Sequence, residues 1–391
     1  MTHSAGRPIL IAGGGIGGLA AALALSKIGR ASLVLEQASE FKEVGAGIQI
    51  SPNVFMMFDV LGIAEAIKQI AVFPDSLTIR DALTAEQVMH IPLGPEFLAR
   101  FRYPYGVIYR PDLLDALLRA CKQSPLIALH TGKSVAGYED RNTHVTIRTD
   151  DDEIFEGAAL VGADGLWSRI RERIVGDGKP RVAGHIAYRA VLPIEKAPTH
   201  ARERRVTLWA GPKIHLVHYP LRRGELLNLV AVFHSDRYEE GWDKYGDPEE
   251  LNEKFKHARS EVRELLALIE AWRMWVLCDR DPVKHWSAGR VTLLGDAAHP
   301  TLQYMAQGGC MAIEDAVVLA RKIEIMQDDF ARAFVAYQED RYLRTARVQL
   351  TSRFVGDYVY HPRGPAAEVR NQMLQNLTRE DMAWLYDGIK A

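Results

Sequence analysis

PILIAGGGIGGLAAALALSKIGRASLVLE, residues 8–36, is the stretch that decides the fold of this chain. Its first apolar run is short and uninterrupted, which is typical of a strand buried on both faces. The glycines of Gly13-x-Gly15-x-x-Gly18 follow directly and lead into an alanine- and leucine-rich helical pattern. A second apolar run then ends on Glu36. Strand, glycine-rich turn, helix, second strand and terminal acid together indicate a dinucleotide-binding unit.

Each part of this unit has a physical role. Gly13 permits the tight turn, Gly15 lets the backbone approach a pyrophosphate, and Gly18 lets the helix pack closely on the strand. The free N–H groups at the helix N-terminus attract the pyrophosphate. Glu36 can accept hydrogen bonds from ribose hydroxyls. A glycine-rich turn without a ligand is the alternative for an isolated fingerprint, but the complete unit favours a dinucleotide site.

Size and composition limit the class of protein. The chain has 391 residues, of which 48% are hydrophobic and 25% charged, so we expect two globular domains or one large composite. A net charge of −2 gives no reason to expect nucleic acid as a partner. No apolar run approaches the roughly 20 residues of a membrane span, and the first strand begins too early for a signal peptide. The three cysteines, odd in number and far apart, fit a reduced compartment, so a cytoplasmic protein is expected.

Two further motifs lie where expected strands end. GADGLWSRIR, residues 162–171, places Asp164, a glycine and arginines at a strand–turn–helix junction. LLGDAAHPTLQYMAQGGCMAIEDA, residues 293–316, places Asp296 after a strand and two glycines before a helix. With the first fingerprint, these motifs resemble the single-component FAD-dependent aromatic hydroxylases, the group that contains p-hydroxybenzoate and salicylate hydroxylases. The three motifs occur in the order and spacing of that family and cover most of the chain.

The resemblance implies bound FAD and NADH as co-substrate, although a second nucleotide fingerprint is not present. Asp296 can accept a hydrogen bond from a ribitol hydroxyl, and the helix after it can present N–H groups to the flavin carbonyl that gains charge on reduction. Asp164 with Arg169 is the candidate for contact with FAD and nicotinamide, and a capped helix start with solvated arginines is the alternative. The residues assigned to FAD are Gly13, Gly15, Ile16, Gly17, Gly18, Glu36, Gln37, Ala46, Gly47, Arg110, Asp164, Asp296, Gly308 and Gly309.

The pattern of elements predicts an α/β fold, in which a discontinuous Rossmann-like FAD-binding domain carries an inserted antiparallel-sheet substrate domain and a C-terminal helical segment. Residues 54–70 and 248–272 are each expected to form one helix, and residues 127–129 to start an antiparallel meander. The expected limits are 1–75, 101–180 and 281–330 for the FAD-binding domain, 76–100 and 181–280 for the substrate-binding domain, and 331–391 for the helical segment.

Gln303 marks a departure from the salicylate-type sequences, which have proline at this position. Proline offers only a carbonyl, whereas Gln303 brings a donor and an acceptor beside the flavin. Together with SEFKEVGAGIQISPN, residues 39–53, and HLVHYPLRRGELLN, residues 215–228, this variant resembles the 3-hydroxybenzoate 6-hydroxylases within the family. The resemblance implies that NADH and O2 are used to add a hydroxyl group para to the existing one, which forms gentisate.

Such a reaction needs an electron-rich ring, because the flavin hydroperoxide of this family is an electrophile. A phenol has a pKa near 10, and holding it as phenolate at neutral pH corresponds to about 4 kcal/mol, which hydrogen bonds and a nearby base can supply. In a strand that contains residues 215–219, His215, Val217 and Tyr219 face one side and His218 the other. We assign His215 as base or proton relay, Tyr219 as a hydroxyl partner, and Gln303 as a polar contact from the flavin side. The alternative for His215 and Tyr219 is a place as half-buried sheet residues.

Other functions stay open at this point. They are a decarboxylating salicylate 1-hydroxylase, a hydroxylase for a 6-hydroxynicotinate-type substrate, and a flavin-binding redox sensor without turnover. The substrate carboxylate has no clear partner, since Arg189 could lie near the ring system or at the surface. The expected partners are a small aromatic acid, O2 and NADH, and the oligomeric state is open, with a homodimer as one option.

Overall fold

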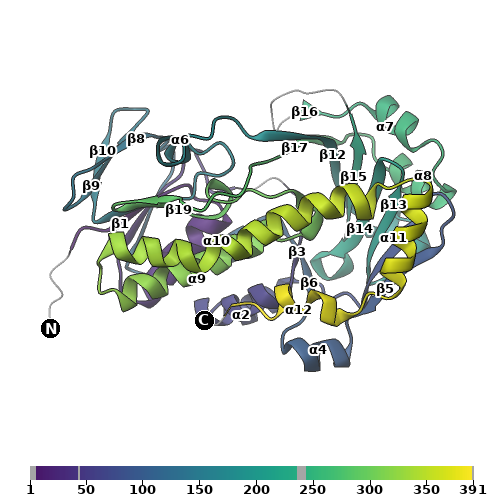
Figure 1. Ribbon diagram of the computed structural model, residues 1–391, viewed down its shortest axis with the longest axis horizontal. Helices are drawn as coiled ribbons and strands as arrows, with labels where there is room; N and C mark the ends of the chain where they lie inside the picture. The colour runs from purple at the N-terminus through teal and green to yellow at the C-terminus, as the bar shows by residue number, and fades with distance from the viewer. Residues whose placement is uncertain (1–5, 43–44, 236–243, 390–391) are drawn as a thin grey trace.

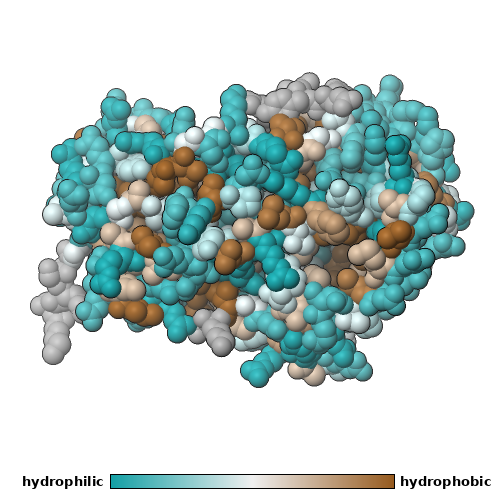
Figure 2. All heavy atoms as spheres, viewed as in Figure 1, coloured by the Kyte–Doolittle hydropathy of each residue, from teal (hydrophilic) through white to brown (hydrophobic). Residues whose placement is uncertain are grey.

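The structure is a computed structural model that describes residues 6–42, 45–235 and 244–389. Figure 1 shows two sheets side by side, with the long helix α10 (Phe330–Phe354) running past both of them. On the face drawn in Figure 2, hydrophilic residues predominate and hydrophobic ones form separate groups. The expected α/β fold, with a parallel sheet and a largely antiparallel one, is confirmed.

The first sheet has six strands in the order β18-β19-β11-β1-β2-β7. All its neighbours are parallel except β18 and β19. Every residue of β1 is buried, as the apolar run predicted. Its strands are β1 (Ile9–Ala12), β2 (Ser32–Leu35), β7 (Ile127–His130), β11 (Ala159–Gly162), β18 (Ser287–Ala288) and β19 (Val291–Leu293). The prediction that residues 127–129 start a meander was wrong, because β7 pairs in parallel with β2. An edge strand with alternating burial has the same sequence pattern in either kind of sheet.

The second sheet has eight strands in the order β16-β17-β12-β15-β14-β13-β4-β5. It is antiparallel except for the parallel pair of β13 and β4. Its strands are β4 (Ser76–Asp81), β5 (Gln87–Pro92), β12 (Arg181–Pro193), β13 (Val206–Gly211), β14 (Ile214–Leu221), β15 (Leu226–His234), β16 (Lys244–Tyr245) and β17 (Arg273–Asp279). Two smaller sheets contain β8 (Val135–Asp140), β9 (Val145–Thr149) and β10 (Ile154–Gly157), and β3 (Gly47–Ile50) with β6 (Gly106–Tyr109). We keep the domain limits as a proposal, which is supported because the strands of the two large sheets fall in the separate ranges expected for them.

The helices are α1 (Ile16–Lys27), α2 (Pro52–Leu61), α3 (Ala64–Ile70), α4 (Pro95–Phe101), α5 (Arg110–Lys122), α6 (Arg169–Ile174), α7 (Pro248–Phe255), α8 (Ser260–Ala267), α9 (Gly308–Ile325), α10 (Phe330–Phe354), α11 (Pro365–Gln375) and α12 (Ala383–Tyr386). Two single helices predicted from the sequence are each divided. Gly62, with φ of 74°, ends α2 in the left-handed conformation. The second break follows α7, where the Arg259 amide donates to the Ala82 carbonyl, a tertiary contact that periodicity does not reveal. Among the described helices, none has the length and apolar character needed to cross a membrane.

A buried ion cluster ties the loop after β19 to α9 and α10. Arg341 of α10 donates to Glu314 at 2.6 Å and to Asp315 at 2.7 Å, and all three side chains have no exposed surface. Asp315 also accepts the Gly295 amide at 3.0 Å and His299 Nε2 at 2.5 Å. Because unpaired buried charges are costly, this arrangement holds the loop in one place. His299 therefore orders the loop.

Candidate active site

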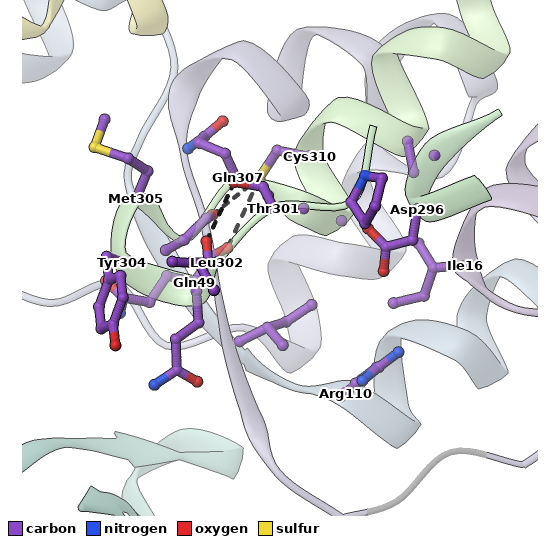
Figure 3. A pocket seen from close by; sticks show the side chains of 18 of the residues that line it. Ile16, Gln49, Arg110, Asp296, Thr301, Leu302, Tyr304, Met305, Gln307 and Cys310 are labelled. Atoms are coloured by element: carbon purple, nitrogen blue, oxygen red, sulfur yellow. Dashed lines mark hydrogen bonds between the residues drawn. The ribbon is translucent and has the colours of Figure 1, made fainter. Parts of the chain in front are cut away.

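One cavity of about 1220 Å³ lies between the two large sheets. Residues at the carboxyl ends of β1, β2 and β11 line one part of it, and residues of β4, β12 and β14 line another. In Figure 3, Arg110 and Asp296 lie at one side of the cavity and Tyr304 at the other. A cavity at the carboxyl edge of a parallel sheet is where nucleotide ligands bind in open α/β folds.

The cavity brings together nearly all the residues that were assigned to the dinucleotide. Gly18 is the exception: an added Cβ would lie 1.9 Å from the Gly13 carbonyl oxygen, so its role is close packing under the turn. Gly13 itself has a φ of 104°, which glycine tolerates. The cavity-lining members are Gly13, Gly15, Ile16, Gly17, Glu36, Gln37, Ala46, Gly47, Arg110, Asp164, Asp296, Gly308 and Gly309.

Gly15 provides a direct test of whether the turn fits a pyrophosphate. It has ordinary extended backbone angles, and a Cβ built there would meet no protein atom within 4 Å. Protein packing therefore does not demand glycine at this position. The open space beside the backbone lies at the N-terminus of α1, where free amides favour a negatively charged group. The residues present fit a dinucleotide.

Glu36 is held at the end of β2 by backbone amides. Its Oε2 accepts the Gly14 N–H at 2.7 Å and its Oε1 accepts the Ala38 N–H at 2.8 Å. A carboxylate has lone pairs for further hydrogen bonds, so Glu36 can still accept from two ribose hydroxyls in the cavity. The backbone thus positions the carboxylate that the sequence pattern indicated.

A second positive helix terminus faces the cavity. Helix α9 begins at Gly308 without a side-chain cap, and both Gly308 and Gly309 line the cavity. The unsatisfied N–H groups of its first turn can stabilise negative charge on a bound ring. Gln307 precedes this turn, and its amide donates to Ser51 Oγ at 2.9 Å, which fixes the loop against α2.

The 162–171 motif both lines the cavity and forms a capped helix start. Asp164 lines the cavity, and it also accepts Ser168 Oγ at 2.6 Å at the start of α6. Desolvation raises the pKa of Asp164. Arg169 lines the cavity as well but is paired at 2.8 Å with the exposed Asp150. The buried Arg171 donates to the carbonyls of Ala297 and Ala298, so this motif supports the loop of the next one.

The three residues assigned to catalysis line the same cavity. His215, Val217 and Tyr219 face it from β14, as strand alternation predicted, and Gln303 faces it from the loop before α9. His218 points to the other face, where its Nε2 accepts Trp209 Nε1–H at 3.2 Å. Burial, with the nearby histidines His185 and His234, lowers the pKa of His215 to about 3.

Arg189 is a partly buried cation in this part of the cavity. Its Nη2 donates to Gln303 Oε1 at 2.5 Å, and its guanidinium lies 5.1 Å from the centre of the Trp275 ring. Its Nε is buried without a hydrogen-bond partner, and among the described residues no carboxylate pairs with it. Desolvation and the positive charge of Arg110 lower the pKa of Arg189 to about 10. Such a cation calls for an anion in the cavity.

Comparison with known proteins agrees with this geometry. The family model described as FAD binding domain matches residues 7–349. The chain is 45% identical to 3-hydroxybenzoate 6-hydroxylase 1 of Aquipseudomonas alcaligenes, with 97% of each chain covered. It is 44% identical to 3-hydroxybenzoate 6-hydroxylase of Polaromonas naphthalenivorans, with 97% of this chain and 95% of that one covered. The chain belongs to the FAD-dependent aromatic hydroxylases.

Solved structures place this hydroxylase in the same fold. Its TM-score is 0.84 with a structure described as a salicylate hydroxylase substrate complex, at 25% identity over 98% of this chain and 96% of that one. The TM-score is 0.85 with the structure of Klebsiella pneumoniae HpxO complexed with FAD and uric acid. The two sequences are 26% identical, and the match covers 97% of this chain and 95% of that one. The cofactor is FAD, and the open space at Gly15, the Glu36 carboxylate and the α9 N-terminus fit it.

Sequence reasoning missed Tyr105, which lines the hydroxylase cavity, and His361, which lies against His215. Tyr105 lines the cavity and donates to Gln49 Oε1 at 2.5 Å. His361, from the C-terminal segment, lies 2.7 Å from His215, between Nε2 and Nδ1. The only available signal for His361 was its place in an aromatic run just before Pro362, where a helix cannot continue.

Proposed function

We propose that the chain hydroxylates 3-hydroxybenzoate para to its hydroxyl group and releases gentisate. 3-Hydroxybenzoate, NADH, O2 and one proton give gentisate, NAD⁺ and water, so that one oxygen atom enters the ring and the other leaves as water. The proposal is carried by identity of 42 to 45% over nearly the whole chain to proteins with this activity in their names. The polar residues of the cavity provide the chemistry that such a substrate needs.

When bound, FAD would supply the redox chemistry of the reaction with NADH and O2. The protein supplies the electron-rich ring. Because its pKa is lowered to about 3, His215 stays neutral and can act as a proton relay: one ring nitrogen accepts the phenol proton while the other passes a proton to His361. Tyr219 and Gln303, which both line the cavity, can donate hydrogen bonds to the phenolate oxygen that forms. Stabilising this charged form promotes attack by the ring.

Arg189 is the proposed partner of the substrate carboxylate. Removing the guanidinium and the substrate carboxylate from water costs several kcal/mol per ion unless the two are paired. A benzoate carboxylate is planar and can accept two parallel hydrogen bonds from a guanidinium. Arg189 also donates to Gln303, the proposed partner of the substrate hydroxyl. The residue that would bind the carboxylate therefore also orients a residue that would bind the hydroxyl.

A substrate screen tests the function. The purified FAD-loaded protein is mixed with NADH, O2 and 3-hydroxybenzoate, salicylate, 4-hydroxybenzoate or 6-hydroxynicotinate. NADH oxidation and oxygen uptake are recorded, and the products are separated by chromatography. We expect stimulation by 3-hydroxybenzoate and gentisate as product. Catechol and carbon dioxide from salicylate would establish the decarboxylating alternative, and absence of stimulation by every phenolic acid would point to a flavin-binding sensor.

A 6-hydroxynicotinate-type substrate is the second candidate. The chain is 33% identical to the 6-hydroxynicotinate 3-monooxygenase of Pseudomonas fluorescens, over 88% of this chain and 90% of that one. The cytoplasmic location, and a homodimer as the assembly, stay predictions. Size-exclusion chromatography with light scattering measures the assembly directly.

A further inference from the structure

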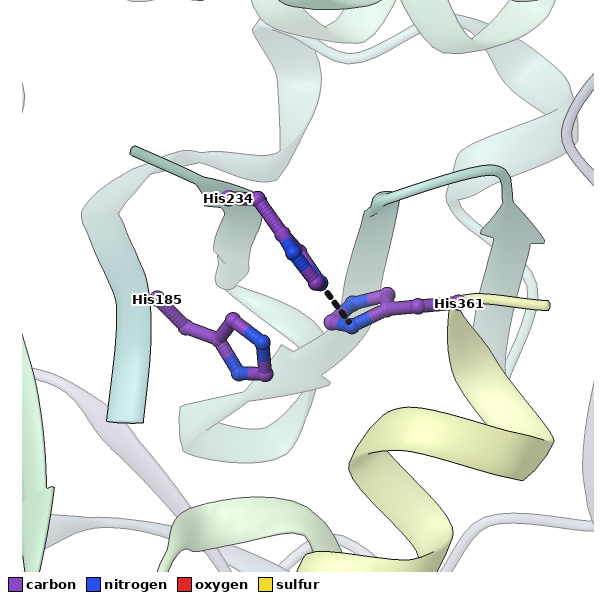
Figure 4. Close-up of side chains that lie close together, drawn as sticks. All are labelled: His185, His234 and His361. Atoms are coloured by element: carbon purple, nitrogen blue, oxygen red, sulfur yellow. Dashed lines mark hydrogen bonds between the residues drawn. The ribbon is translucent and has the colours of Figure 1, made fainter. Parts of the chain in front are cut away.

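Three histidine side chains converge beside the cavity (Figure 4). His185 on β12 and His234 on β15 are direct cross-strand partners, so their side chains lie on the same face of the sheet. His361 reaches them from the segment after α10. One nitrogen from each ring lies within 4.8 Å of the other two, with His185 and His361 buried and His234 partly exposed.

We propose that His185, His234 and His361 bind one divalent transition-metal ion of the Zn²⁺ type. Zn²⁺ binds imidazole nitrogens at about 2.0–2.1 Å in tetrahedral geometry, which separates two ligand nitrogens by roughly 3.3 Å. His234 Nε2 and His361 Nδ1 are 3.1 Å apart. His185 Nε2 faces Asp357 Oδ1 at 3.9 Å, so this carboxylate is available as the fourth ligand.

The second nitrogens of two rings already have the partners that metal-binding histidines require. His185 Nδ1 lies 2.5 Å from Tyr304 Oη, and His361 Nε2 lies 2.7 Å from His215 Nδ1. Hydrogen bonds of this kind orient a ligating ring and fix which nitrogen carries the proton. They leave His185 Nε2 and His361 Nδ1 to face the centre of the cluster.

A hydrogen bond between His234 and His361 is the simpler explanation for the closeness of those two rings. It does not account for the position of His185. The centre of that ring is 4.1 Å from the His234 ring and 5.0 Å from the His361 ring. Within the described residues, His185 makes its hydrogen bond to Tyr304 rather than to either histidine. A shared ion explains why the three rings gather. Asp357, whose side chain is 57% exposed, gives the ion access from solvent and compensates part of its charge.

The site has a consequence for catalysis, which rests on the proposed function. A metal ion on His361 Nδ1 keeps the proton of that ring on Nε2, which then donates to His215 Nδ1. His215 in turn carries its proton on its other nitrogen and becomes a donor toward the substrate. We therefore expect bound Zn²⁺ to slow phenol deprotonation and to lower the yield of hydroxylated product per NADH consumed.

Calorimetric titration of the chelator-treated, FAD-loaded protein with Zn²⁺ tests the site. We expect one ion per chain in the wild type and an affinity at least about tenfold lower in His234→Gln. Asp357→Asn, a second variant at a solvent-exposed position, should also weaken binding. The exposed His257→Gln is the matched control and should bind as the wild type does. Retained FAD content shows that each variant is folded.

Co²⁺ gives an independent readout, because four-coordinate Co²⁺ absorbs visible light strongly. Its spectrum should appear in the wild type and be lost in His234→Gln. Absence of stoichiometric binding, or wild-type affinity in His234→Gln, would overturn the site. Zn²⁺ binding without any change in product yield would overturn the link to His215. If no hydroxybenzoate stimulated NADH oxidation, the proposed function would fail while the titration still reported on the metal site.

Discussion

Gly15→Val separates the demands of the cofactor from those of the fold. The backbone of Gly15 is extended, with φ −72° and ψ −173°, and an added Cβ meets no protein atom within 4 Å. We expect the FAD-free variant to unfold at the same temperature as the FAD-free wild type. With FAD the two should differ, because the new side chain occupies the space through which the pyrophosphate approaches the backbone.

The size of the difference follows from linkage. FAD at 100 times its dissociation constant stabilises the folded protein by about 2.7 kcal/mol. At about 2.1 cal/mol/K per residue, the unfolding entropy of 391 residues is roughly 0.8 kcal/mol/K, so FAD should raise the wild-type Tm by about 3 °C. The variant should show no such rise. Gly18→Ala should behave differently and lose stability even without FAD, since its Cβ would lie 1.9 Å from the Gly13 oxygen.

Differential scanning fluorimetry with and without FAD, together with flavin absorbance after gel filtration, measures both effects. Gly94→Val is the matched control. Gly94 also precedes a helix with extended angles, φ −75° and ψ −158°, and has open space around its Cβ, but it does not line the cavity. It should keep the full FAD-dependent shift. A Gly15→Val protein that keeps its yellow flavin colour, and whose Tm rises by the same amount of about 3 °C with FAD, would refute the assignment of this turn to the pyrophosphate.

Further predictions concern the substrate site and the ion cluster. His215→Ala should divert NADH oxidation to hydrogen peroxide, and an unchanged gentisate yield would remove His215 from the mechanism. Arg189→Met should raise the KM for the benzoate by on the order of 10- to 100-fold, the equivalent of one charged hydrogen bond, and leave the KM for NADH unchanged. Arg341→Met removes the buried cation that Glu314 and Asp315 share, while Glu314 keeps Arg344 and Asp315 keeps His299. Urea unfolding should therefore show a loss of about 3 kcal/mol, the lower end for a broken buried ion pair. Burial acts to raise the pKa of Asp315, but the charges of its partners prevail and lower it to about 2. Its contribution to stability should therefore be complete above pH ~4 and be lost as the pH falls toward 2, and Asp315→Asn should lack that acid-dependent step.

The FAD half of the site could be predicted because its signals are local. The turn, the helix start and the acid at the end of β2 all lie in one unbroken stretch, so spacing alone specifies their arrangement. The same holds for Asp296 and the glycines that open α9, which are separated by one short loop. Strand alternation was also sufficient to place His215 and Tyr219 on one face of β14.

Long-range contacts decided the rest. His361 reaches His215 across 146 positions, and Arg171 supports the Ala298 carbonyl across 127 positions. The location of Arg189 depended on which face of β12 is turned toward the cavity, and the break after α7 on a hydrogen bond to a distant loop. These contacts have no sequence motif, since each depends on the packing of two separately folded segments.

The sequence by itself determined the α/β class, the dinucleotide turn and the residues that line the FAD end of the cavity. Only the tertiary structure decided that a partly buried Arg189 lines the cavity and that three histidines gather behind His215. The physical reason is the range of the interactions. Turns, caps and strand alternation are set by neighbouring residues, whereas the pairing of buried charges and rings is set by which sheets and helices come to lie against one another.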